Sequence, residues 1–194
     1  MSNASSRELR FSEEQAMILE SAQDFCRNKS GIEQVRKLLQ SKNDKQHPGF
    51  DASVWREMVE LGWLGVAIPE SLGGSGLGIG TSVCIAESMG RHLLSTPFFS
   101  STLSAQVLLR GGTQSQQQHW LPKIAEGSIA ALALLDNEDW GDETPRCSAM
   151  EKDGKVVLNG VKPLVCDAGV ADVFLVLVSH QSGDQAAQPA LALV

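Results

Sequence analysis

The sequence predicts an α+β protein: an all-α N-terminal domain over residues 5–127, then an antiparallel, β-barrel-type domain over residues 128–194. Two observations predict it. Before Gly127, apolar residues recur at the spacing of one helix face, and after it they come in short β-rich runs separated by turn residues. Hydrophobic residues also make up 42% of the 194 residues, which is enough to build a core.

Local start and stop signals place the helices of the first domain. Two capping boxes begin a first and a last helix, Ser12 with Gln15 and Thr113 with Gln116. Asp51 is expected to cap a third helix that ends at Gly62. Further helices are expected over residues 32–40, 81–92 and 97–109, and four apolar residues of the first of these are predicted to point inward, namely Ile32, Val35, Leu38 and Leu39.

Turn residues and apolar runs place the remaining elements. Residues 63–70 are expected to be extended and closed by a proline, and the five glycines between positions 73 and 80 are expected to form a structural turn. Buried strands are predicted at residues 129–135 and 173–178, hairpin strands at 155–158 and 161–166, and a last strand at 190–194. A chain that stops inside a strand is interpreted as a fragment of a longer protein.

Composition excludes several classes of function. The net charge is −7, which disfavours nucleic acid and basic membrane-surface binding. No apolar run approaches the about 20 residues of a membrane helix, and no secretory signal is visible. The four cysteines form no C-x-x-C pair, so buried free thiols and a reducing cytoplasm are expected.

The residues themselves show no metal or phosphate site. The four histidines are scattered, and the acidic run between Asp136 and Glu143 lacks the order of a calcium loop, so it is interpreted as a solvated loop and no metal is predicted. The glycine-rich stretch matches neither G-x-G-x-x-G nor the Walker pattern. No set of residues forms a catalytic constellation by itself.

Three segments in order resemble the acyl-CoA dehydrogenase family. They are LGWLGVAIPESLGGSG at residues 61–76, GTQSQQQHWLPKIAEG at residues 112–127, and LNGVK at residues 158–162 followed by Ala171-Asp172. The resemblance implies a helical N-terminal domain, a β-barrel middle domain and a C-terminal helical bundle that is absent from this chain. FAD would lie between the middle and C-terminal domains, against a neighbouring subunit.

The resemblance also implies the chemistry of the whole protein. It would remove hydrogen from an acyl-CoA thioester and pass electrons to a second flavoprotein, as a homo- or hetero-oligomer. The family's glutamate base lies in the C-terminal domain, so no catalytic residue is expected in this chain, and the fragment alone is expected to be inactive. Family helices that line the acyl-chain pocket suggest three substrate-binding positions, Ser88, Leu94 and Ser95.

The middle domain departs from the family pattern at the flavin. Positions that hold Thr, Ser, Trp and Thr in many members hold Leu135, Gly141, Leu164 and Cys166 here, whereas backbone contacts from residues such as Leu132 and Leu134 do not depend on side chains. Each lost hydrogen bond or aromatic contact costs about 0.5–1.5 kcal/mol, so the four changes are expected to weaken FAD binding by about 2–6 kcal/mol, up to complete loss. Two alternatives follow: a flavin-dependent acyl-CoA dehydrogenase, or a flavin-poor, non-catalytic subunit of a hetero-oligomeric one.

Overall fold

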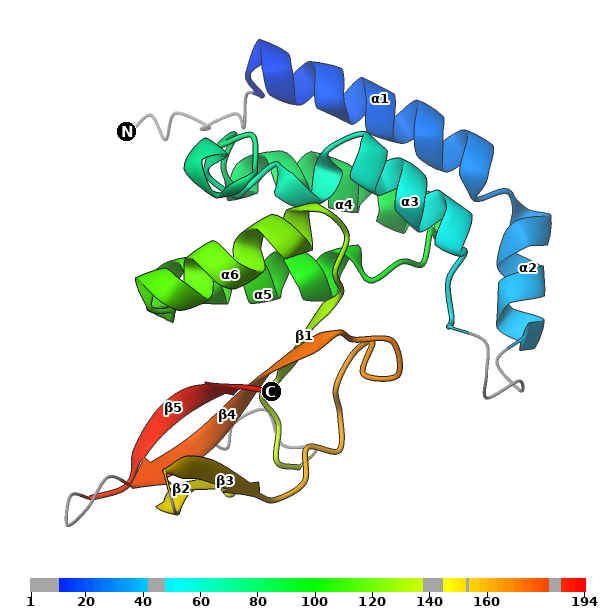
Figure 1. Cartoon of the computed structure of the whole chain (residues 1–194). Helices are drawn as coiled ribbons and strands as arrows, with labels where there is room; N and C mark the ends of the chain where they lie inside the picture. The colour runs from blue at the N-terminus through cyan, green and yellow to red at the C-terminus, as the bar shows by residue number, and fades with distance from the viewer. Residues whose placement is uncertain (1–10, 42–47, 138–144, 153, 182–185) are drawn as a thin grey trace, which may run out of the picture.

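Helices form one side of the molecule and strands the other (Figure 1). The computed structural model describes residues 11–41, 48–137, 145–152, 154–181 and 186–194. Helix α1 packs along α4, and α5 and α6 lie between those upper helices and the sheet (Figure 1). The predicted α+β class is confirmed.

The helices begin and end within two residues of the predicted positions. Their bounds are α1 Glu13–Lys29, α2 Ile32–Gln40, α3 Ala52–Glu60, α4 Ile79–His92, α5 Phe98–Gly111 and α6 Gln114–Ala125. Both capping boxes are formed, and Asp51 accepts backbone N–H bonds from Ser53 and Val54 at the start of α3. After α3, Gly62 takes the left-handed conformation, with φ +73°, that stops a helix.

The segment from residue 63 to residue 70 is not extended, so that prediction was wrong. It forms two single turns of 3-10 helix, η2 Trp63–Gly65 and η3 Glu70–Leu72. The glycine-rich segment that follows folds back on them. The N–H of Ser75 donates to the carbonyl of Gly65, and the N–H of Leu77 donates to the carbonyl of Val66. A short apolar run does not distinguish a buried strand from a buried helical segment.

Helix α2 is packed less tightly than its pattern predicts. None of its residues is buried, and Ile32 and Leu39 are 57% and 56% exposed instead of pointing inward. Only Val35 and Leu38 are half-buried. The amphipathic pattern correctly predicted a helix here, but not that it lies at the edge of the domain.

The sheet is mixed rather than wholly antiparallel. Its strands are β1 Ala130–Ala133, β2 Ser148–Lys152, β3 Lys155–Asn159, β4 Val173–Gln181 and β5 Gln188–Leu193. The hairpin β2–β3 and the pair β4–β5 are antiparallel, but β1 and β2 both run parallel to β4. The strand β2 was not predicted, and β3 pairs with it rather than with residues 161–166. They share one edge of this long strand, β1 along its first half and β2 along its second, while β5 covers the other edge.

The predicted strand at residues 161–166 does not form. This segment belongs to the long connection that returns the chain from β3 to the start of β4, and its one described ladder contact is an isolated antiparallel bridge between Leu164 and Leu135. The connection ends at Asp172, whose carboxylate accepts the N–H of Ile129 at 2.8 Å. The connection brings the chain back to the end of the sheet where β1 begins. Strand β4 therefore starts beside β1 and runs in the same direction.

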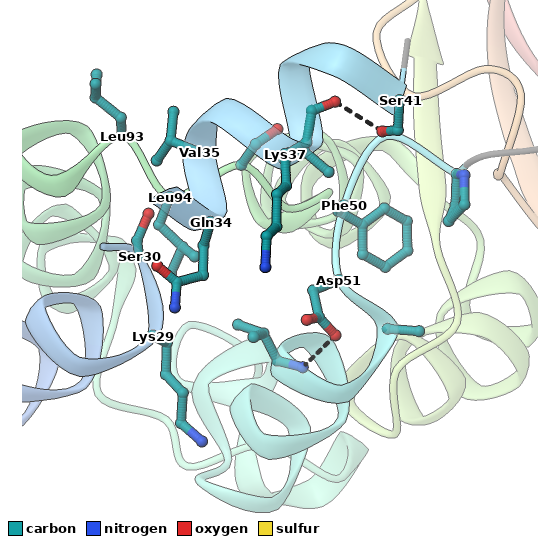
Figure 2. A pocket seen from close by; sticks show the side chains of 15 residues that line it. Lys29, Ser30, Gln34, Val35, Lys37, Ser41, Phe50, Asp51, Leu93 and Leu94 are labelled. Atoms are coloured by element: carbon teal, nitrogen blue, oxygen red, sulfur yellow. Dashed lines mark hydrogen bonds between the residues drawn. The ribbon is translucent and has the colours of Figure 1, made fainter. Parts of the chain in front are cut away.

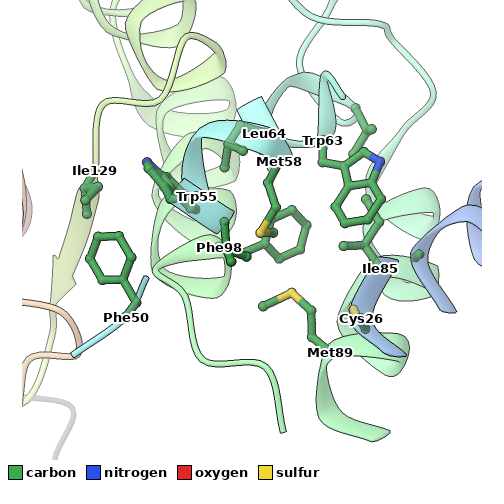
Figure 3. Close-up of a cluster of buried hydrophobic side chains, with 13 residues drawn as sticks. Cys26, Phe50, Trp55, Met58, Trp63, Leu64, Ile85, Met89, Phe98 and Ile129 are labelled. Carbon is green, nitrogen blue, oxygen red and sulfur yellow. The ribbon is translucent and has the colours of Figure 1, made fainter. Parts of the chain in front are cut away.

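The helical core lies between α1, α3 and α4. It includes Cys26, Met58, Trp63, Ile85 and Phe98, which meet in Figure 3. A second core cluster joins α5 and α6 to β1 and β4. Two side chains of the helices bond the backbone of the segment that leads from α6 into β1. The indole of Trp55 donates to the carbonyl of Gly127 at 3.0 Å, and the hydroxyl of Ser101 accepts the N–H of Ala130 at 3.2 Å.

The four cysteines are all free thiols. Cys26, Cys84 and Cys147 are buried, as expected, but Cys166 is exposed. Burial raises the pKa of the Cys26 thiol to about 11. Among the helices of the described ranges, none is both long and apolar enough to cross a bilayer.

Replacing Gly74 by alanine is expected to destabilise the fold by about 3 kcal/mol or more. A Cβ there would stand 2.0 Å from the carbonyl oxygen of Ile68 and 2.4 Å from that of Gly65, so the backbone must move. Gly90→Ala, in the interior of α4 with nothing within 4 Å of the added atom, is the control and is expected to stabilise by up to about 1 kcal/mol. Urea unfolding of both variants measures the difference, and equal midpoints would contradict the expectation.

Candidate functional site

Three of the predicted flavin-contact positions lie together at the end of β1. The bridge between Leu135 and Leu164 joins the segment after β1 to the β3–β4 connection. Leu134 and Leu164 are 37% and 50% exposed, and Leu135 is half-buried. The side chains at this edge are therefore aliphatic, with no hydroxyl or indole group among these three positions.

The other predicted cofactor positions are dispersed or not described. Leu132 lies within β1 and packs against the second core cluster, toward the helices. Cys166 is exposed and two residues beyond Leu164. Gly141 lies outside the described residues, so its contact with the cofactor remains a prediction.

A buried ion pair holds this edge together. The ammonium of Lys162 lies 2.7 Å from the carboxylate of Asp136, and the two side chains are 7% and 8% exposed. The same ammonium donates to the carbonyl of Leu134 at 3.0 Å, so this backbone oxygen is already bonded within the chain. Asp136 also accepts the backbone N–H groups of Arg146 and Cys147 at 3.1 and 3.2 Å.

The Asp136 carboxyl is charged in this setting. Burial alone raises its pKa, but the hydrogen bonds from Lys162 and from the two backbone N–H groups outweigh burial, and the pKa lies below its ordinary value. The interpretation of residues 136–143 as a solvated run was therefore wrong for Asp136. No periodicity signals a contact between residues 26 positions apart, although Lys162 belongs to the LNGVK segment.

Helix α5 is anchored to the same connection. The hydroxyl of Ser100 donates to the carboxylate of Asp167. Asp167 has φ +58°, a left-handed conformation that aspartate adopts at low cost, and its carbonyl accepts the N–H of Val170 at 3.1 Å. No pattern in the sequence signalled either residue. The contact fixes the exposed Cys166 loop against the helical layer.

A cavity of about 560 Å³ opens between the end of α1, α2, the start of α3 and the α4–α5 loop (Figure 2). Two of the three predicted substrate-binding residues, Leu94 and Ser95, line it. Ser88 does not: it is fully buried, and its hydroxyl donates to the carbonyl of Cys84 at 3.0 Å within α4. Ser88 is thus a core residue in this structure.

Within the described ranges, no three His, Cys, Asp or Glu side chains lie close enough together to hold a metal ion. At the end of β1, the carboxylate of Asp136 pairs with the ammonium of Lys162 instead. The described edge can present an aliphatic surface to a flat or apolar partner, and the ion pair between Lys162 and Asp136 lies beside this surface.

Comparison with known proteins defines the class. The family model for the acyl-CoA dehydrogenase N-terminal domain matches residues 12–128, more than half of the chain. The chain belongs to the acyl-CoA dehydrogenase family. It is 34% identical over 145 residues to acyl-CoA dehydrogenase FadE27 of Mycobacterium tuberculosis, a match that covers 74% of this chain and 38% of that protein.

Solved structures give the same result. A variant of the steroid acyl-CoA dehydrogenase Tcur3481–Tcur3483 has a TM-score of 0.79 at 28% identity, covering 94% of this chain and 48% of that one. The ChsE4–ChsE5 complex of M. tuberculosis has a TM-score of 0.77 at 29% identity, covering 95% and 48%. An acyl-CoA dehydrogenase complexed with FAD from Bacillus anthracis has a TM-score of 0.77 at 27% identity, covering 95% and 32%. The chain therefore spans less than half of the length of each of these proteins.

Lys162→Met is expected to destabilise the protein by about 3 kcal/mol, because it leaves the Asp136 carboxylate buried without its cation. The matched control is Arg91→Met, which removes an exposed ion pair with Glu87 and is expected to change stability by no more than about 0.5 kcal/mol. Urea unfolding at neutral pH measures both. A loss for Lys162→Met as small as the control's would show that the pair is not buried in solution.

The stability contributed by Asp136 is expected to depend on pH. Its folded pKa lies below the unfolded value of about 3.9, so the contribution is complete above about pH 4 and is lost as the pH falls through the folded pKa. Unfolding free energies between pH 6 and pH 3 should therefore fall less steeply in Asp136→Asn than in the wild type. Asp51, whose pKa is also lowered, mainly by its bonds to Ser53, supplies a slope that both proteins share. Identical slopes would contradict the assignment.

Proposed function

We propose that the full-length protein dehydrogenates an acyl-CoA thioester between its α and β carbons, with the hydride passing to FAD. This chain would form its N-terminal helical domain, residues 5–127, and the first part of its middle domain, residues 128–194. The observation that carries the proposal is the family match over residues 12–128, together with a described fold that continues past it into the sheet. The free thiols fit a reducing, cytoplasmic location.

The described side chains fit an FAD ring poorly. Leu135 and Leu164 can contact the face of a ring, but they offer it no hydrogen bond. The carbonyl of Leu134 is already bonded to Lys162. Binding of FAD by this chain would therefore rest on backbone groups near the end of β1, on contacts outside the described residues, or on a neighbouring subunit. Leu94 and Ser95 are proposed to contact the acyl chain through the cavity that they line.

A second candidate is a flavin-poor subunit that completes a hetero-oligomeric acyl-CoA dehydrogenase. The aliphatic edge formed by Leu134, Leu135 and Leu164 favours it, because such a surface suits protein packing better than a polar cofactor. It is also supported by the likeness to the ChsE4–ChsE5 complex. In this reading a flavin-bearing partner chain supplies the reactive centre.

One experiment separates the two functions. The full-length protein is purified alone, incubated with FAD and examined for flavin absorbance and its bleaching by an acyl-CoA. A yellow protein that bleaches supports the enzyme. A colourless protein that takes up no FAD contradicts the enzyme, and capture of a flavin-bearing partner from the native host supports the second candidate.

The double variant Leu135→Thr, Leu164→Trp is expected to bind FAD at least about tenfold more tightly than the parent, since it restores one hydroxyl and one aromatic contact. Val156→Thr, an exposed change on β3 away from this edge, is the control and should leave FAD affinity unchanged. Titration of the full-length protein with FAD, followed by flavin fluorescence, measures the difference. An unchanged affinity in the double variant would show that these positions do not face the flavin.

A further inference from the structure

The cavity under α2 combines an apolar wall with the ammonium of Lys37 (Figure 2). Its apolar lining comes from separate elements: Val35 and Leu38 of α2, Phe50 and Val54 around the start of α3, and Leu93 and Leu94 after α4. A volume of about 560 Å³ is in the range of sites that hold small molecules, which are mostly apolar with a few polar groups.

Of the charged side chains in the described lining, Lys29 and Asp51 each have a hydrogen-bonding partner within the chain. Lys29 pairs with Glu57 at 2.7 Å. The carboxylate of Asp51 accepts the hydroxyl and the N–H of Ser53, at 2.7 and 2.8 Å, as the cap of α3. Lys37 extends from α2 into the cavity, and in the described part of the chain no carboxylate lies within ion-pair distance of its ammonium (Figure 2). This ammonium is therefore the group that a ligand could neutralise.

The packing of α2 points to the same cavity. The helix buries none of its residues, and its two half-buried side chains, Val35 and Leu38, are both in the cavity wall. An aliphatic chain in the cavity would remove their remaining apolar surface from water, at about 25 cal/mol per Å². A ligand would thus supply contacts that the helix lacks.

We propose that this cavity binds an aliphatic chain that ends in a carboxylate, with the chain along Val35, Leu38 and Phe50 and the carboxylate on Lys37. A single ammonium matches a single negative charge, and the Asp51 carboxylate in the same lining repels a doubly charged phosphate more strongly than a singly charged carboxylate. Two sources have this chemistry: a free fatty acid, or an acyl group with a carboxylate at its far end. The second source rests on the proposed function, because it makes Lys37 a specificity-determining residue for the acyl chain.

The first test measures binding of decanoate and of neutral decanol to the 194-residue chain by calorimetry. Decanoate is expected to bind, and Lys37→Met, which keeps the aliphatic stem, is expected to weaken it at least tenfold while leaving decanol unchanged. Arg36→Met, next on the same helix and removing only an exposed pair with Glu33, is the control and should leave both affinities unchanged. Equal decanoate affinity in Lys37→Met and the parent would overturn the proposal.

The second test distinguishes the sources, using the full-length protein with two thioesters, decanoyl-CoA and the CoA half-thioester of decanedioate. Tighter binding of the carboxylated thioester, lost in Lys37→Met, supports an acyl substrate with a distal carboxylate. Lys37-dependent binding of decanoate alone supports a free fatty acid. Failure of both probes to bind overturns the proposal. These readouts are affinities, so a protein that binds them but shows no dehydrogenation contradicts only the proposed function.

Discussion

The structure depends on satisfying the backbone where the first strand enters the sheet. Ala130 is fully buried and Ile129 nearly so, and their N–H groups need partners that no strand of the described ranges supplies. Asp172 provides one from the end of the β3–β4 connection, and Ser101 provides the other from α5. Because the two partners come from opposite layers, the start of β1 fixes the helices, the sheet and the returning connection relative to one another.

The candidate site has two unlike parts. At the end of β1, the connection between β3 and β4 places Leu164 against Leu135. The charged groups there, Lys162 and Asp136, pair with each other. At the far side of α3, the loosely packed α2 leaves a cavity in which the ammonium of Lys37 has no carboxylate partner among the described residues. The first part has the character of an interface and the second that of a binding site.

The sequence predicted what is encoded locally and missed what is not. Capping side chains such as Ser12, Asp51 and Thr113 act within three residues, so the helix boundaries followed from them. The parallel pairing of β1 with β4 and the bond between Lys162 and Asp136 join distant segments, and no spacing pattern signals them. The flavin-contact positions came from the family resemblance alone, which singled out Leu135 and Leu164 separately but could not show that they pair or that Ser88 is a core residue.

Cys166 is the one exposed cysteine of the four, so it can be labelled selectively. The other three thiols are buried, and burial raises the pKa of Cys26 and of Cys84, so neither forms the reactive thiolate readily. A maleimide dye should consequently label the chain at one place, on the loop that Ser100 and Asp167 hold against α5. An environment-sensitive fluorophore there would report, by its emission colour, whatever approaches the aliphatic edge of the sheet.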